Sequence, residues 1–214
     1  MVACGGCRAK NFITGELAPM QTIPCTKCGH PVMLPFRMRQ FELRSVIASG
    51  GMATVFRAFD LNLEREVAIK LVKKDMAADP EVMKSFYREA RVIAALNHTN
   101  ILHVYTFDEF EGEPYLAMEI ADNGSLDSRI EAEGRVHELT VLDVAVKIAD
   151  ALSSAMKHNI LHRDIKPGNI LFNGEGEPKL MDFGLGGTEA HLDSDSAVYG
   201  TPQYIAPEKL TRGG

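Results

Sequence analysis

The chain carries the stretch His162-Arg163-Asp164-Ile165-Lys166-Pro167-Gly168-Asn169, which combines a carboxylate, two cations and an amide. Asp182-Phe183-Gly184 follows it, and Thr201-Pro202-Gln203-Tyr204-Ile205-Ala206-Pro207-Glu208 comes next. Upstream, Glu66-Val67-Ala68-Ile69-Lys70-Leu71-Val72 has the pattern of an apolar strand with one lysine at its centre. Four such motifs in this order do not arise together by chance.

Together these motifs resemble those of the eukaryotic-type (Hanks-type) Ser/Thr protein kinases, which also occur in bacteria. The resemblance covers residues 41–214. It implies an α+β, protein-kinase-like fold with a β-rich small lobe over 41–118, a hinge over 119–123 and a helical large lobe over 124–214. The implied activity is ATP-dependent phosphorylation of Ser or Thr hydroxyls on protein substrates, in a signalling role.

The resemblance also assigns roles in the large lobe. Asp164 would accept the proton of the substrate hydroxyl, and Lys166 would steady the γ-phosphate of ATP. Asn169 and Asp182 would bind Mg²⁺, a hard cation that prefers oxygen ligands. Phosphoryl transfer spreads negative charge, so these groups would act mainly by positioning and electrostatic stabilisation.

In the small lobe, Lys70 would hold the α- and β-phosphates and pair with Glu89, on a helix predicted over 80–96. Met118 would lie at the back of the adenine pocket, and the backbone of Glu119 and Ala121 would bind adenine. The implied nucleotide contacts are Ile47, Ala48, Ser49, Gly50, Gly51, Met52, Ala53, Thr54, Val55, Ala68, Lys70, Met118, Glu119, Ala121 and Leu171.

An activation segment is expected between Asp182 and Glu208. Arg163 stands beside the catalytic aspartate, where a phosphate on this segment could dock. Ser194 and Ser196 are the candidate phosphorylation sites. Thr201 is expected instead to bond to Asp164 and Lys166.

All four cysteines lie in the first 28 residues, as the pairs Cys4/Cys7 and Cys25/Cys28. Two C-x-x-C pairs at this separation are typical of a zinc site, because each tight turn supplies two thiolates to a tetrahedral ion. Residues 1–34 are therefore interpreted as a small zinc ribbon and 35–40 as a linker. Disulfides are the alternative, but no secretion signal precedes the cysteines and cytosolic thiols stay reduced. His30 is expected to be a solvated loop residue, since four cysteines complete the coordination.

Composition limits the other possibilities. The 214 residues are 45% hydrophobic and 24% charged, with a net charge of −6 and no Trp. These values exclude a disordered or fibrous protein, and they do not favour nucleic acid as a partner. No apolar run approaches the roughly 18 residues of a membrane span, so a cytoplasmic location is expected. Protein substrates, and a protein partner for the ribbon, are the expected interactions.

Three functions remain open from the sequence. The first is an active kinase. The second is a nucleotide-binding pseudokinase or scaffold, because Ala48 and Ala53 stand where the kinase loop carries glycine. The third is a zinc-ribbon adaptor with an inactive fragment attached. A whole kinase domain takes roughly 250 residues, so the kinase part is expected to be incomplete and the chain a piece of a longer protein. A helix is predicted over 140–158, with an inward face of Leu142, Val146, Ala149, Leu152 and Met156.

Overall fold

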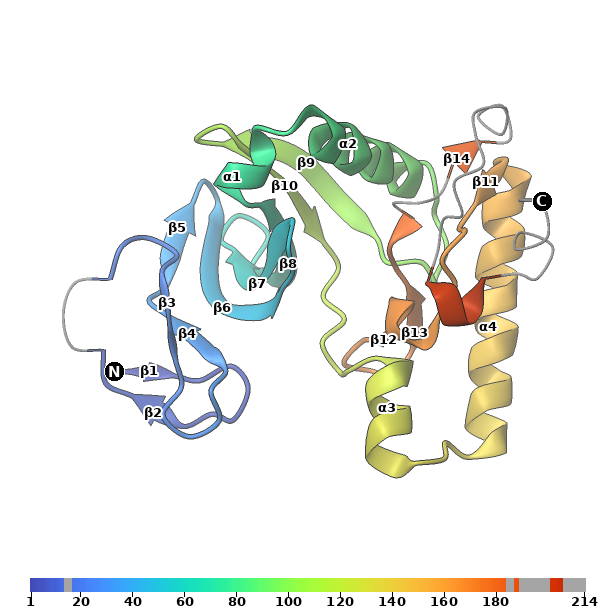
Figure 1. Cartoon of the computed structure of the whole chain (residues 1–214), viewed down its shortest axis with the longest axis horizontal. Helices are drawn as coiled ribbons and strands as arrows, with labels where there is room; N and C mark the ends of the chain where they lie inside the picture. The colour runs from blue at the N-terminus through green and yellow to red at the C-terminus, as the bar shows by residue number, and fades with distance from the viewer. Residues whose placement is uncertain (14–16, 184–186, 189–200, 206–214) are drawn as a thin grey trace. The chain divides into compact units, whose positions relative to one another are not determined.

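A computed structural model describes residues 1–13, 17–183, 187–188 and 201–205 of the chain. The chain divides into two units, each described by itself. The first combines residues 1–82 with 105–120, and the second combines 83–104 with 121–214. Figure 1 shows the first unit built mainly of strands and the second mainly of helices with short hairpins.

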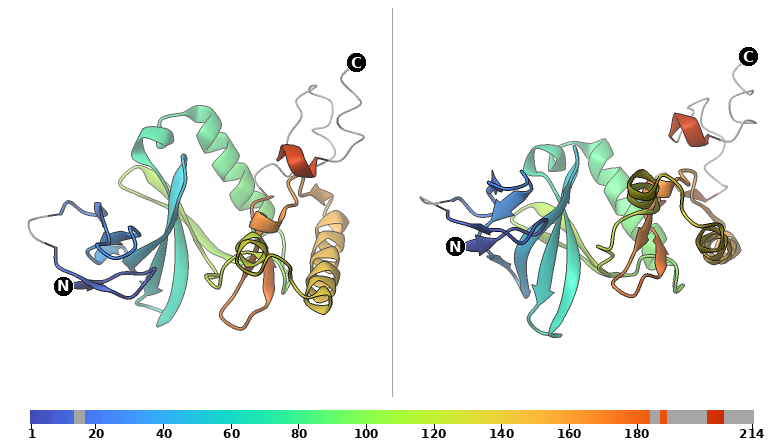
Figure 2. Two further views of the ribbon diagram at one scale, coloured as in Figure 1. Left: turned by 60° about the horizontal axis from the view of Figure 1, so that its bottom comes forward. Right: turned by 90° about the horizontal axis from the view of Figure 1, so that it is seen from below.

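A curled six-stranded sheet forms most of the first unit, in the order β5-β6-β7-β8-β10-β9 (Figures 1 and 2). Antiparallel pairing joins β5 to β6, β6 to β7, β7 to β8 and β8 to β10. The strands are β5 (Phe36–Met38), β6 (Phe41–Ser49), β7 (Ala53–Asp60), β8 (Arg65–Val72), β9 (Val104–Phe110) and β10 (Glu113–Met118). The short helix α1 (Lys74–Ala77) follows β8.

The core of this unit lies against one face of the sheet. Val46, Phe56, Ile69 and Ala117 are buried there with residues of the neighbouring strands. Tyr115 is fully buried, and its ring meets Phe41 edge-on, with 6.0 Å between ring centroids. The β-branched and aromatic residues that favour strands thus also fill this core.

Two small hairpins precede the sheet. The first pairs β1 (Val2–Ala3) with β2 (Lys10–Asn11), and the second pairs β3 (Thr22–Pro24) with β4 (Pro31–Met33). Each hairpin carries one C-x-x-C pair. The predicted linker, 35–40, contains β5, which pairs along the edge of β6. In this edge strand Met38 is buried in the core and Arg37 is exposed to solvent.

Most of the helix α2 (Pro80–Ala94) belongs to the second unit. The carboxylate of Asp79 accepts the N–H of Glu81 at 2.9 Å, and Pro80 occupies the first turn, a favoured arrangement at a helix start. The helix predicted over 80–96 is confirmed except in its last residues. The other elements of the unit are α3 (Leu126–Glu133), α4 (Glu138–Lys157), β11 (Ile160–Leu161), η1 (Pro167–Asn169), β12 (Ile170–Phe172), β13 (Pro178–Leu180), β14 (Gly187–Thr188) and η4 (Pro202–Tyr204).

The helix α4 confirms the helix predicted over 140–158, but the predicted inward face is wrong. The buried residues are Val144, Ile148, Ala151 and Ala155, which pack with β11 and β13. Leu142, Val146 and Met156 are each more than 60% exposed, Ala149 is exposed and Leu152 is half-buried. The helix carries two apolar stripes, and only tertiary packing decides which of them is covered.

In the part of the chain that the structure describes, no helix has both the length and the apolar composition that crossing a membrane requires.

Candidate active site and cysteine cluster

The loop of residues 162–169 connects β11 to β12 and is anchored by His162. This side chain is 3% exposed, and its Nε2 lies 2.8 Å from the carbonyl oxygen of Met181. Its ring also packs against Phe183, with 4.6 Å between ring centroids. His162 therefore ties the loop that carries Asp164 to the segment that carries Asp182.

Burial lowers the pKa of His162, so its imidazole is neutral at pH 7. A neutral ring has one donor and one acceptor nitrogen. Nε2 faces the Met181 carbonyl and is thus the donor, which leaves Nδ1 to accept the N–H of Asp164 at 3.3 Å. The histidine fixes the backbone on both sides of the loop.

The carboxylate of Asp164 is the centre of a hydrogen-bond network. Oδ1 accepts the N–H of Thr201 at 3.0 Å and its hydroxyl at 2.8 Å. Oδ2 lies 2.7 Å from Nζ of Lys166 and accepts Nδ2 of Asn169 at 3.1 Å. Burial raises the pKa of Asp164, but the bonds from Lys166, Thr201 and Asn169 outweigh it and lower the pKa to about 2. The group is therefore a carboxylate at every physiological pH.

The contacts expected of Thr201 are confirmed. Besides its two bonds to Asp164, its Oγ1 accepts Nζ of Lys166 at 2.8 Å. Three side chains, Asp164, Lys166 and Thr201, thus form a closed triangle.

Asn169 and Asp182 both lie in the second unit, beside this network. Asn169 is 4% exposed, and its Nδ2 donates to the backbone oxygen of Asp164 at 2.8 Å as well as to its carboxylate. This orientation leaves Oδ1 as the atom that Asn169 could offer to a cation. The carbonyl oxygen of Asn169 accepts the N–H of Met181 at 3.0 Å, next to Asp182.

Asp182 has a φ of 62°, a left-handed conformation that is rare outside glycine. Its neighbour Phe183 is fully buried in the same core as Ile93 of α2. Backbone strain of this kind persists where the surroundings hold it, and it is common at functional sites. The Met181 bond and the buried Phe183 ring hold Asp182 on both sides.

Arg163 also has a left-handed backbone, with a φ of 67°. Its Nε and one terminal nitrogen, Nη2, are buried, and neither has a hydrogen-bond partner within the described residues. Two buried guanidinium nitrogens without a partner among the described residues carry a free-energy cost, which an anion beside Arg163 would offset.

Glu89 lies on α2, where it is 5% exposed beside the buried Phe86 and Ala90. Lys70 lies in the first unit, half-buried in β8, where it is paired in register with Val55 of β7 and Leu116 of β10. Lys70 and Glu89, the predicted ion pair, therefore belong to different units of the chain.

The turn between β6 and β7 is closed by a hydrogen bond from the N–H of Gly50 to the carbonyl of Ala53, at 3.0 Å. A Cβ added at Gly51 would meet no atom within 4 Å, and one at Gly50 would come only as near as 3.7 Å to a backbone oxygen. Neither glycine has a positive φ. Within the described residues, the fold therefore does not itself require glycine at these two positions.

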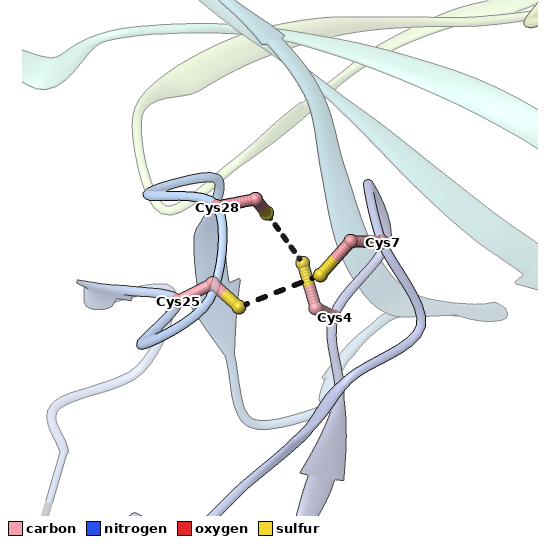
Figure 3. Close-up of side chains that lie close together, drawn as sticks. All are labelled: Cys4, Cys7, Cys25 and Cys28. Atoms are coloured by element: carbon pink, nitrogen blue, oxygen red, sulfur yellow. Dashed lines mark hydrogen bonds between the residues drawn. The ribbon is translucent and has the colours of Figure 1, made fainter.

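The four cysteines of the two hairpins meet at one point (Figure 3). All four Sγ atoms lie within 4.8 Å of one another. The Sγ atoms of Cys4 and Cys28 are 3.6 Å apart, and those of Cys7 and Cys25 are 3.7 Å apart. Four thiolates about 2.3 Å from a tetrahedral ion would be roughly 3.8 Å apart. All four are free cysteines, so the donor set and its spacing fit Zn²⁺.

Sequence reasoning missed Asn11, which supports this cluster. Asn11 is 2% exposed; its Nδ2 lies 3.4 Å from Sγ of Cys25, and its Oδ1 accepts the N–H of Thr26 at 3.1 Å. The expectation for His30 was wrong: it is half-buried, with Nε2 2.9 Å from the carbonyl oxygen of Val46 in β6. No local signal could have found this bond, because its acceptor lies in another element.

Residues 41–214 match the protein kinase domain family. The chain belongs to the protein kinase family. The expected fold class, a kinase domain with a β-rich small lobe preceded by a cysteine module, is thereby confirmed, and the four clustered cysteines are compatible with a zinc ribbon.

Similar curated proteins are bacterial Ser/Thr kinases. The kinase PrkC of Bacillus subtilis is 37% identical over 177 residues, which cover 82% of this chain and 27% of that protein. PknB of Mycolicibacterium smegmatis is 36% identical over 178 residues, covering 79% and 28%. PknA of Mycobacterium tuberculosis is 38% identical over 177 residues, covering 79% and 41%. The chain thus spans between about a quarter and two fifths of the length of these relatives.

The residues expected to contact adenine lie in both units of the kinase domain. Met118 ends β10 and is 7% exposed, paired in register with Ala68 of β8. Glu119 follows it in the first unit, while Ala121 and Leu171 belong to the second. Gly184, the candidate phosphorylation sites Ser194 and Ser196, and the Ala206-Pro207-Glu208 motif lie outside the described residues.

Proposed function

We propose that the protein transfers the γ-phosphoryl group of ATP to Ser or Thr hydroxyls of protein substrates, in a signalling role. The observation that carries this proposal is the network around Asp164, whose carboxylate is fixed by Lys166, Thr201 and Asn169. Because little covalent chemistry is asked of a kinase, a rigidly placed carboxylate and cation are what the reaction needs.

Asp164 would orient the substrate hydroxyl and accept its proton. With a pKa of about 2, it is a weak base, so its main contribution is to position the hydroxyl oxygen for attack. Lys166 would place its charge against the transferred phosphate. Its present bond to Thr201 holds the Nζ atom ready beside Asp164.

Lys70, Asn169 and Asp182 would hold Mg-ATP, with Glu89 orienting Lys70. The ligand atoms offered by Asn169 and Asp182 are oxygens, which fits Mg²⁺. When bound, the ion neutralises charge on the phosphates. The left-handed backbone at Asp182 and the buried Asn169 amide support a site built for such a purpose.

The nucleotide would lie against the turn that follows β6, with the adenine contacts named above. Gly50 and Gly51 support this, because no atom of the described residues would lie closer than 3.7 Å to a Cβ at either position, so packing there does not require glycine. A side chain there would stand between the backbone N–H groups and a phosphate.

Arg163 supports a further part of the proposal, namely autophosphorylation of the activation segment at Ser194 or Ser196. Its buried nitrogens without partners within the described residues would be satisfied by a phosphate. Mass spectrometry after incubation with ATP should find phosphate between residues 184 and 201; an unmodified segment would contradict this part.

For the four cysteines we propose a structural Zn²⁺ ion. The sulfur spacings, and the Asn11 amide that orients Cys25, support it. Because the two hairpins are too small to build a core unaided, the ion would supply their folding energy. The ribbon could in addition bind a protein partner.

A radiolabel transfer assay on the whole chain tests the catalytic proposal. The substitution Asp164→Asn should reduce phosphate transfer by about 10²-fold or more. The matched control Asp143→Asn makes the same change on the surface of α4, where Asp143 forms an ion pair with Lys147 at 3.0 Å, and should leave the rate unchanged.

Nucleotide binding is measured on the same two variants, because it separates a kinase from a pseudokinase. Both should bind an ATP analogue as the wild type does. Nucleotide binding together with transfer at the background level in both proteins would show that the chain binds nucleotide without catalysing transfer, and equal transfer above background would show that Asp164 is not the catalytic group. Ala48 and Ala53 are the residues that favour that second function.

A further inference from the structure

The strand β4 belongs to two hydrophobic cores at once. Val32 is 2% exposed and packs with Cys4 and Cys25 in the cysteine module, that is, the two hairpins of residues 1–34. Met33, the next residue, is 1% exposed and packs in the core of the six-stranded sheet. Successive residues of a strand face opposite sides. One strand can therefore join the two cores, and β4 does so.

Polar and close contacts add to this junction. His30 places Nε2 2.9 Å from the carbonyl oxygen of Val46, in β6. A Cβ added at Gly5 would lie 3.1 Å from both Cβ and Oγ of Ser45, also in β6. The turn of the first cysteine pair thus lies directly against the strand, and glycine allows that approach.

The contact lies where the pairing of β6 with β7 is irregular. The β6–β7 pairing shifts register between Leu43 and Ser45 and again between Val46 and Ala48. These irregularities bracket Ser45 and Val46, which contact Gly5 and His30 of the cysteine module. Bulges weaken a ladder locally and increase its twist. The same strand ends at Ser49, where the glycine turn begins.

We infer that the metal-bound cysteine module is a brace of the kinase small lobe, so that loss of the metal loosens β6 and the glycine turn after it. This inference rests on the zinc site proposed above. Without the ion, the two hairpins lose the interaction that folds them. Met33 and His30 then lose their fixed positions, which opens the sheet core and frees the Val46 carbonyl.

Hydrogen exchange of the whole chain tests the inference, after bound zinc has been measured in the purified protein. About one zinc per chain is expected. Removing it with a chelator should accelerate exchange of the amides of residues 41–49 by about tenfold or more, and adding zinc back should restore protection. The amides of α4 should keep their protection throughout, which reports that the second unit remains folded.

The variant His30→Ala separates docking from metal binding, because His30 is not one of the four thiolate donors. It should retain zinc yet show faster exchange in residues 41–49. The matched control is His158→Ala, which removes a histidine that also contacts a backbone carbonyl, that of Ser154 at 3.0 Å. This control should exchange like the wild type in β6.

The outcomes are distinct. A protein that binds zinc, but whose β6 exchange is unchanged by chelation while residues 1–13 lose protection, would overturn the brace and leave the zinc site standing. Absence of zinc from the purified protein would overturn the zinc site and the brace together. Neither the zinc measurement nor hydrogen exchange depends on kinase activity. A failure of the proposed catalysis would therefore be seen only in the radiolabel transfer assay.

Discussion

Thr201 directs both its backbone N–H and its hydroxyl at one oxygen of Asp164, at 3.0 and 2.8 Å. The same hydroxyl accepts Nζ of Lys166 at 2.8 Å, so that each of the three side chains is bonded to the other two. A residue remote in sequence thus helps Lys166 and Asn169 to orient the carboxylate on which the proposed reaction depends.

Replacing Thr201 with Val should lower phosphate transfer by about tenfold or more, because the hydroxyl bonds to Asp164 and Lys166 are both lost while the backbone N–H bond remains. Thr201→Ser keeps the hydroxyl and should retain most of the rate. The comparison of kcat for the two variants, with nucleotide affinity measured alongside, checks this. Equal rates would mean that the hydroxyl has no positioning role.

The stability of the second unit should fall steeply in acid. The folded pKa of Asp164, about 2, is below the ordinary value near 3.9. The native state thus favours the carboxylate, and the stabilisation is complete above pH of about 4 and is lost as the pH falls through about 2. Thermal unfolding from pH 5 to 2 should show a steeper loss for the wild type than for Asp164→Asn, and parallel curves would contradict the prediction.

His162 should make the free energy of unfolding of the second unit depend on pH near and below pH of about 6.5 as well. Burial lowers its folded pKa, so the unfolded chain binds the proton more readily. Its contribution is present above pH of about 6.5 and is lost as the pH falls below that value. His162→Phe keeps a ring beside Phe183 and removes the titration; its melting temperature should be lower at pH 7 and fall less between pH 7 and 5.

Asn11→Ala should weaken zinc binding by about tenfold to 100-fold, because groups that orient metal ligands contribute on this scale. Asn11→Asp should weaken it more, since it replaces the Nδ2 donor beside Cys25 with an oxygen that repels a thiolate. Competition with a chromophoric chelator gives the affinities. Wild-type affinity in both variants would show that Asn11 serves packing alone.

The covered face of α4 can be tested by a matched pair. Ile148→Ala removes a residue that is 5% exposed and should cost about 2–5 kcal/mol in the free energy of unfolding. Val146→Ala changes a residue that is 65% exposed and should cost at most about 0.5 kcal/mol. Denaturant unfolding measures both. Equal losses of unfolding free energy in the two variants would show that the apolar stripe containing Val146 is also packed against another part of the protein.

Some features were predictable because they depend on neighbours in sequence. Spaced cysteine pairs predict a thiolate site, since each tight turn brings two sulfurs together. The apolar strand around Lys70 and the helix that carries Glu89 were predicted from periodicity, and the structure has both. The bonds of Thr201 followed from the resemblance to kinases, which is itself a property of ordered motifs.

Other features depended on surfaces that the sequence does not describe. Periodicity identifies α4 as amphipathic, but the helix has two apolar stripes, and packing against β11 and β13 selected Ile148 over Val146. Likewise the residues around Phe36 read as a linker, yet they form an edge strand because β6 offers them an unpaired side.

The sequence by itself determined the family, the residues of the proposed catalytic loop and the four cysteines of the proposed zinc site, because residue type and local spacing are enough to specify them. Tertiary structure alone decided that β4 serves two cores and that His30 bonds to Val46. It also decided the low pKa of Asp164. The physical reason is that burial and hydrogen-bond partners arise between elements distant in the chain, and their free energies exist only once those elements have packed together.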